Sequence, residues 1–276
     1  MSGIKDWFLN QNMSWIKVII MAVITAVITA VLNLIPSLSD TSFQDIAINL
    51  DCWILFAVFI IVNCEKWWEA SLKTFTFFLI SQPLIYLIEV PFVALGFGLF
   101  QYYKYWFMIT ILTLPGAAIA FLLKRGSWIS VVVLSVATGF LSYMMAHYFW
   151  SVNAHFPHHL LSLIFCIALS VFFIFVFLEK KIHRVVGIIV VAVVFSISVF
   201  LLKPIMTYKI YLPEGNWRYD VEDDSLVEIG DEDDNSYIVT AVKEGTTFIT
   251  FEDQLGNIEE YYVTVTSGGI FVGKLN

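Results

Sequence analysis

The chain has 276 residues and a net charge of −8, with 59% hydrophobic and 14% charged residues and a mean hydropathy of +0.81. Soluble domains carry about 25% charged residues, so this composition excludes a soluble globular protein and predicts a multi-pass protein in a lipid bilayer. Residues 1–207 carry eleven Lys and Arg against eight Asp and Glu, whereas residues 208–276 carry four against fifteen. This change in charge predicts an apolar domain over 1–207 and an acidic domain over 208–276, and it excludes nucleic acid as a partner.

Seven stretches of the apolar domain are long enough, or nearly so, to cross a bilayer, because a helical span requires about 20 apolar residues. They are residues 15–35, 46–63, 72–90, 105–123, 128–150, 160–178 and 185–206. The second is the weakest, because Asn49 and Asp51 interrupt its beginning. The segment 91–103 contains two glycines and is too short for an eighth span, so we expect a re-entrant or interfacial segment there. The sequence therefore predicts an all-α membrane bundle of about seven helices.

The positions of Lys and Arg predict the orientation of these helices, because basic loops are retained in the cytoplasm. With a cytoplasmic N-terminus, nine Lys and Arg residues fall on the inner side and only Lys104 falls in an outer loop. Lys203 and Lys209 follow the last span, and we expect them to reach back to the interface. Residues 1–39 have a signal-like start and end, but their apolar core of eighteen residues favours an uncleaved anchor. We expect a multi-pass protein of the cell membrane with its C-terminal domain outside.

The stretch HYFWSVNAHFPHH, residues 147–159, holds four of the five histidines and falls on the predicted outer side. Together with carboxylates that flank the outer ends of other spans, these histidines could hold Zn²⁺ or Mn²⁺, or carry protons. The candidate ligands are His147, His155, His158, His159, Glu89 and Asp51, with Asp40 and Asp45 nearby. The alternative is an interfacial loop in which histidines suit a half-polar layer, since no HxH or HExxH spacing is present. Cys52, Cys64 and Cys166 lie in or beside apolar runs, and we expect each to be a buried small side chain.

The acidic domain alternates short runs rich in Val, Ile, Thr and Tyr with turn clusters, which predicts β-strands. The predicted strands are 217–221, 226–229, 237–242, 246–251 and 260–266. In the last strand Tyr261, Val263 and Val265 share one face, while Tyr262 and Thr264 lie on the other. This period of two is typical of a half-buried antiparallel strand, so we expect a small all-β sandwich.

Three segments of this domain, SLVEI, YIVTAVKEGTTFITF and YYVTVT, resemble the second half of a bacterial immunoglobulin-like domain of group 2. That family has an aliphatic strand, a V-T-A strand, a turning Gly, a T-x-I-T strand and a final V-T-V strand. The matching residues are Val239-Thr240-Ala241, Gly245, Thr247, Ile249-Thr250 and Val263-Thr264-Val265. The resemblance covers about sixty residues, with the first strands abbreviated, and it implies an Ig-like fold rather than an activity. Because such domains occur on surface and secreted bacterial proteins, it also implies an envelope protein.

Three functions are compatible with the sequence. The first and favoured function is a non-enzymatic binding or accessory subunit whose residues 208–276 meet an envelope protein or the cell wall. The second is a transporter or channel for a small solute or metal ion, with an outer His/Asp/Glu site. The third is a membrane-embedded enzyme that acts on a lipid or an envelope polymer, although the sequence contains no GxSxG, HExxH or phosphate-binding loop and identifies no catalytic residue.

Overall fold

A computed structural model describes residues 2–39, 41–154, 156–203, 206–213, 215–233, 236–266 and 268–275. By its internal contacts the chain divides into two compact units. The helical unit contains the residues up to Val152 and Phe156–Leu201, and the β unit contains Leu202–Asn276 together with Asn153–His155. The predicted order of an apolar helical part followed by a β part is confirmed.

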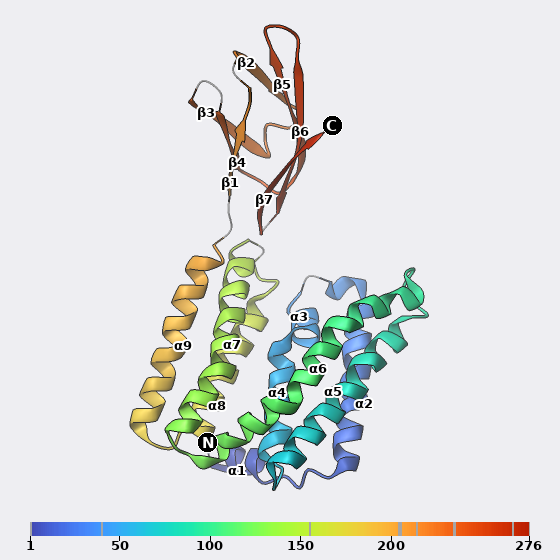
Figure 1. Cartoon of the computed structure of the whole chain (residues 1–276), viewed down its shortest axis with the longest axis vertical. Coiled ribbons are helices and arrows are strands. Elements are labelled where there is room, and N and C mark those ends of the chain that lie inside the picture. The colour runs from blue at the N-terminus through green and yellow to red at the C-terminus, as the bar shows by residue number, and fades with distance from the viewer. Residues whose placement is uncertain are drawn as a thin grey trace. The chain divides into compact units, whose positions relative to one another are not determined.

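The helical unit is built from long apolar helices (Figure 1). Six of its described helical stretches are long and apolar enough to cross a membrane. They are α2 (Trp15–Leu34), α5 (Trp67–Glu89), the stretch centred on α6 (Phe100–Ala120), α7 (Trp128–Ala154), α8 (Leu160–Phe177) and α9 (Lys181–Leu201). Shorter pieces are α1 (Ser2–Leu9), η1 (Pro36–Leu38), α3 (Ser42–Ile48) and α4 (Leu50–Val62).

The predicted second span is a broken helix rather than a straight one. α3 and α4 meet at Asn49 and are bent by 46° relative to each other, so only the pair together has the length of a span. The bend lies where the sequence places Asn49 and Asp51, whose side chains compete with the helical backbone for hydrogen bonds. The prediction of about seven spans therefore corresponds to six single helices and one bent pair.

The predicted extra segment at 91–103 has a simpler structure than expected. Residues 90–95 form turns, and a 3₁₀ turn, η2 (Gly96–Leu99), leads directly into α6. With η3 (Phe121–Arg125), this gives one helical stretch of 30 residues from Gly96 to Arg125. The expected start at residue 105 is wrong, because the glycines that suggested a loop are used only for the turn: Gly96 has φ +52°.

Small residues and one amide determine much of the packing of the helical unit. Ala22, Ala26 and Ala30 of α2 are completely buried, as their four-residue spacing suggests for close helix contact. The short helix α1 was not predicted. Asn63, at the end of α4, fastens it, because its Nδ2 donates to the Phe8 carbonyl (2.8 Å) and its Oδ1 accepts from the Gln11 N–H (2.6 Å).

The β unit consists of two antiparallel sheets. One has the order β1 (Thr207–Tyr211), β4 (Ser236–Ala241), β3 (Val227–Asp233), and the other has the order β2 (Trp217–Val221), β5 (Gly245–Asp253), β6 (Ile258–Thr266), β7 (Gly269–Leu275). The predicted alternation in β6 is confirmed, since Val263 and Val265 are buried while Tyr262 is exposed. Two packed antiparallel sheets are compatible with an Ig-like fold. The sequence did not predict β1 and β7.

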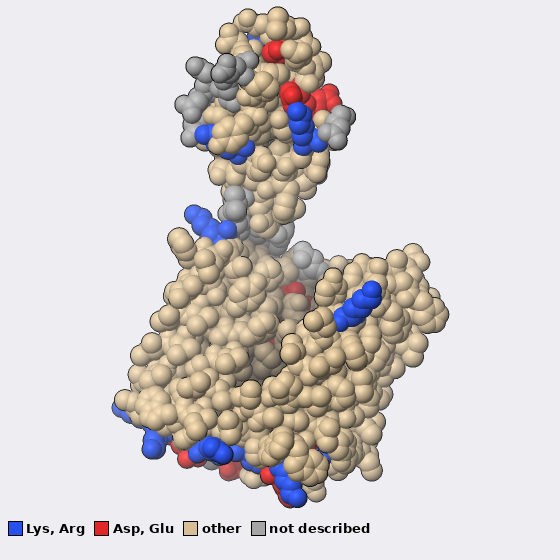
Figure 2. Space-filling view, viewed as in Figure 1, with Lys and Arg blue, Asp and Glu red and all other residues tan. Residues whose placement is uncertain are grey.

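Charge is distributed unevenly over the helical unit (Figure 2). Lys and Arg side chains gather at the end where α1 lies, and the sides of the bundle are almost free of charge. Large apolar side chains cover these sides, for example Val136, Val193 and Phe200, which are at least half exposed. An apolar outer surface of this kind is what lipid chains require of a protein in a membrane.

Candidate functional site

A cluster of polar side chains surrounds the break between α3 and α4, where these helices meet α7 and α8. We call it the break cluster. Its members are Asp45, Asn49, Asp51, Tyr148, His159, Ser162 and Cys166. Together they bring two carboxylates into a region of the molecule that is otherwise apolar.

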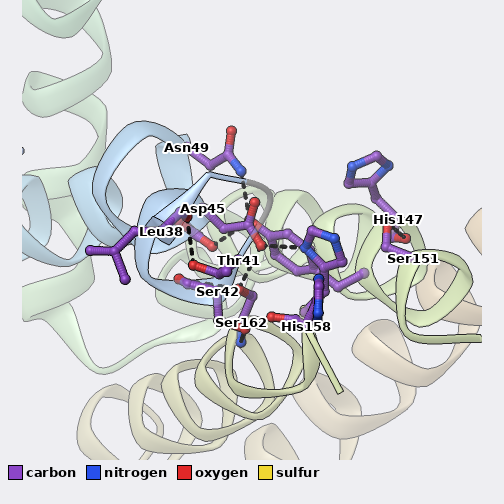
Figure 3. Close-up of polar contacts among 12 residues, drawn as sticks. Leu38, Thr41, Ser42, Asp45, Asn49, His147, Ser151, His158 and Ser162 are labelled. Carbon is purple, nitrogen blue, oxygen red and sulfur yellow. Dashed lines mark hydrogen bonds and ion pairs between the residues drawn. The ribbon is translucent and has the colours of Figure 1, made fainter. Parts of the chain in front are cut away.

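Asp45 joins the beginning of α8 to α3 (Figure 3). Its Oδ2 lies 2.7 Å from Nδ1 of His159, and the Ser162 hydroxyl donates to the same oxygen at 2.9 Å. Ser42, also on α3, donates through both its backbone N–H and its hydroxyl to the His158 carbonyl, each at 2.8 Å. His159 is 7% exposed, so its contact with the carboxylate is shielded from solvent and is stronger than a surface ion pair.

Asp51 is completely buried in the first turn of α4. Its Oδ1 accepts from the N–H of Cys52 (2.7 Å), and its Oδ2 accepts from the Tyr148 hydroxyl (3.1 Å) and lies 3.4 Å from Sγ of Cys166. The Tyr148 hydroxyl in turn accepts from Nδ2 of Asn49 at 2.8 Å. The result is a short chain of hydrogen bonds that begins at the residue where the span breaks.

This arrangement has a free-energy cost that packing alone does not explain. A buried carboxylate loses its hydration, and it is tolerated only where hydrogen bonds replace the lost water. In membrane helices such groups face the bundle interior and often mark the route of an ion or proton. With an imidazole, a phenol and two carboxylates, the break cluster has the groups needed to hold or transfer a proton.

The structure separates the predicted metal ligands into different surroundings. Asp51 and His159 belong to the break cluster, while Glu89 lies elsewhere and pairs with Asn33. His147 is exposed beside Ser151 (Figure 3), with its ring 5.7 Å from the ring of Tyr148.

Two further histidines complete the predicted set. His158 is exposed, and its backbone carbonyl makes the contact with α3. His155 lies outside the described residues, as does the nearby carboxylate Asp40. Among the residues that the structure describes, no three His, Cys, Asp or Glu side chains are grouped closely enough to hold a metal ion. The outer metal site, with Zn²⁺ or Mn²⁺, therefore stays a prediction.

Sequence reasoning missed four members of the break cluster. Asn49 was read only as an interruption of a span, Cys166 only as a small buried residue, and Tyr148 and Ser162 were not singled out. Ser162 follows His159 by three residues at the beginning of α8, a spacing that places two side chains on one helix face. That spacing is the one local signal that could have identified a member; the other contacts join residues about a hundred positions apart.

No family model, no curated protein and no solved structure matches this chain. The fold and the break cluster therefore define a class only: a bundle of long apolar helices with a buried polar cluster, joined to a domain of two antiparallel sheets.

Proposed function

We propose that this chain is a bacterial cell-envelope protein that lies in the cell membrane, presents its acidic Ig-like domain outside the cell and works as a non-enzymatic binding subunit. The inner placement of Lys and Arg and the family resemblance of residues 208–276 support the orientation. The partner is a protein of the envelope or a cell-wall polymer.

One surface of the β unit carries this proposal. Phe248 of β5, Tyr262 of β6 and Phe271 of β7 lie on the outward face of their sheet and are 42%, 42% and 60% exposed. Phe248 is directly opposite Tyr262 in the strand register, and Phe271 is opposite Thr264, two residues further along β6. We call these three side chains the aromatic face. Adjacent exposed aromatic rings are more typical of a binding surface than of solvated sheet, because each ring offers a large rigid contact area.

The chemistry around the aromatic face narrows the choice of partner. Glu252 and Glu260 are exposed on the same side of β5 and β6. Aromatic rings beside carboxylates suit a partner that offers apolar surface together with hydroxyl, amide or cationic groups. Both envelope proteins and cell-wall polymers meet this description.

The test is capture of a partner by the full-length protein from an envelope fraction. The double substitution Phe248→Ser and Phe271→Ser should reduce the captured partner at least about tenfold, because aromatic anchors dominate such interfaces. Val242→Ser and Leu255→Ser remove exposed apolar side chains outside the aromatic face and serve as the matched control. Equal capture by both double variants would reject the proposal for this surface.

A second candidate function is the passage of protons or a small solute or metal ion through the helical unit. The observation that favours it is the break cluster, since carriers often place their ion sites at the breaks of discontinuous helices. The protein reconstituted in liposomes should then dissipate a pH or cation gradient, and Asp51→Asn should abolish the flux. Asp6→Asn, an exposed carboxylate on α1, is the control. A flux no faster than that of empty liposomes would reject this candidate.

A further inference from the structure

A second polar region of the helical unit is a small cavity enclosed by α2, α3, α5 and α6. Its volume is about 60 Å³. Its polar lining comes mainly from Asn33 of α2, from Gln82, Tyr86 and Glu89 of α5, and from the end of α3 at Ile48. A single water needs about 10–15 Å³ by this measure, so the cavity can hold one ion with a few ligating atoms or waters. We call it the glutamate cavity.

Glu89 is the charged group of this cavity and is held in a fixed position. It is 3% exposed, and its Oε1 accepts from Nδ2 of Asn33 at 2.8 Å. Asn33 is oriented by Gln44 of α3, whose Nε2 donates to its Oδ1 at 2.9 Å. The amide nitrogen of Asn33 therefore faces Glu89, and one carboxylate oxygen is fixed by protein while the second is available to another ligand.

Gln82 provides an independent indication that something is bound. Its side chain is 2% exposed and lines the glutamate cavity, yet its Nε2 has no hydrogen-bond partner among the described residues. A buried amide group without a partner costs about 1–3 kcal/mol, so such a group is normally completed by a ligand or water. A half-turn of the amide exchanges its nitrogen and oxygen, which lets the same side chain offer an oxygen to a cation.

The half-helix α3 adds negative potential at the same place. It ends at Ile48, which lines the cavity together with Ala47, and the chain breaks at the next residue. The carbonyl end of a helix carries partial negative charge, and carbonyl groups at the ends of half-helices are recurrent cation ligands in membrane proteins.

We propose that the glutamate cavity binds one alkali metal cation, with ligands from the Glu89 carboxylate, the Gln82 amide oxygen and the carbonyl end of α3. Oxygen ligands suit hard cations, and Ca²⁺ requires six to eight of them, usually with several carboxylates. The described lining contains a single carboxylate, which balances one positive charge. The inference goes beyond the proposed binding function and does not require that the protein transports anything.

The test is the thermal unfolding of the purified full-length protein in NaCl or KCl, compared with N-methylglucamine chloride at equal ionic strength. A cation that binds only the folded state raises Tm, and saturating Na⁺ or K⁺ should raise it by at least about 4 °C. Glu89→Gln should abolish this rise. Glu65→Gln, which changes an exposed carboxylate outside the cavity, should keep it.

A second variant keeps the proposal testable if Glu89→Gln fails to fold. Gln82→Leu removes an unpartnered amide and replaces it with an apolar group, so the variant should fold at least as well as the native protein in the absence of alkali cations. It should also bind ²²Na⁺ or ⁸⁶Rb⁺ at least about tenfold more weakly in equilibrium dialysis. No alkali-specific rise in Tm of the native protein, or an unchanged rise and affinity in Gln82→Leu, would overturn the proposal. Because both readouts measure binding, the absence of flux in liposomes leaves it standing.

Discussion

Asp51 is the most completely buried carboxylate of the break cluster, and the groups that surround it depend on it. The N–H of Cys52 and the hydroxyl of Tyr148 both donate to it, and these donors have no access to solvent in the buried interior. At this scale the sequence gives little guidance. It marks Asp51 as a polar residue at the edge of a weak span, but partners that lie about a hundred residues away are determined by the packing of four helices.

Asp51→Ala should lower the free energy of unfolding by about 1–3 kcal/mol, because it leaves the Tyr148 hydroxyl without its acceptor in an apolar interior. The measurement is thermal unfolding of the purified protein in detergent, with Asp6→Ala as the exposed control. A Tm equal to that of the control variant would show that the hydrogen-bond chain contributes no stability.

In the β unit, a single carboxylate organises the turn between β5 and β6. Asp253 accepts from Nδ2 of Asn257 (2.6 Å) and from the N–H groups of Asn257 and Leu255 (2.8 Å each). The hydrogen bond from the Asn257 side chain, followed by the backbone hydrogen bonds, holds the pKa of Asp253 below its ordinary value. A lowered pKa in the folded state means that the carboxylate form stabilises the fold above the ordinary Asp pKa of about 3.9.

This stabilisation should be lost as the pH falls below about 4 and through the lowered pKa of the folded protein. The Tm of the β unit in the full-length protein should exceed that of Asp253→Asn at neutral pH, and the difference should shrink steadily in this acidic range. A difference that is constant from neutral to acidic pH would contradict the role of the ionised carboxylate.

At the scale of elements, hydropathy predicts the long helices well, because each has a continuous apolar run and few alternatives. The misses are short or interrupted elements. The eight-residue α1 is too short to show a span, and η2 begins among glycines that favour a loop prediction. In the β unit, β7 contains two glycines, which weaken the alternation by which strands are recognised.

Gly273 of β7 has a specific function in the second sheet. A Cβ at this position would lie 2.3 Å from Cε1 and Cζ of Tyr262, so the tyrosine ring covers the glycine directly. Gly273→Ala should displace this ring, disturb the aromatic face and increase cleavage of the edge strand by chymotrypsin. Gly230→Ala in β3, where an added Cβ meets no atom within 4 Å, is the matched control. Equal cleavage and equal partner capture by both variants would argue against the displacement.

At the scale of the whole molecule, composition and charge are sufficient to predict a helical membrane bundle followed by a β domain. The sequence could not predict that the polar residues of the bundle form two separate groups, because that division depends on which helices are neighbours. Orientation stays a prediction from the placement of Lys and Arg.

The orientation can be tested in intact cells. Protease added outside should remove the β unit, and a reporter fused after Asn276 that is active only outside the cytoplasm should be active. Protection of the β unit together with activity of a cytoplasmic reporter at the same position would place this domain inside and would exclude an external partner.

The seven-residue α3 touches both polar groups through consecutive residues: Gln44 holds Asn33 at the glutamate cavity, and Asp45 contacts His159. Consecutive side chains of a helix point about 100° apart, so a rigid rotation of α3 must change both contacts at once. The two halves of the bundle are thus mechanically linked through one lever. In a thermodynamic cycle, Asp45→Asn and Glu89→Gln should show an interaction energy of at least about 0.5 kcal/mol, whereas Asp253→Asn and Glu89→Gln should be additive. A ligand bound at one site would then alter affinity at the other by the same factor in both directions.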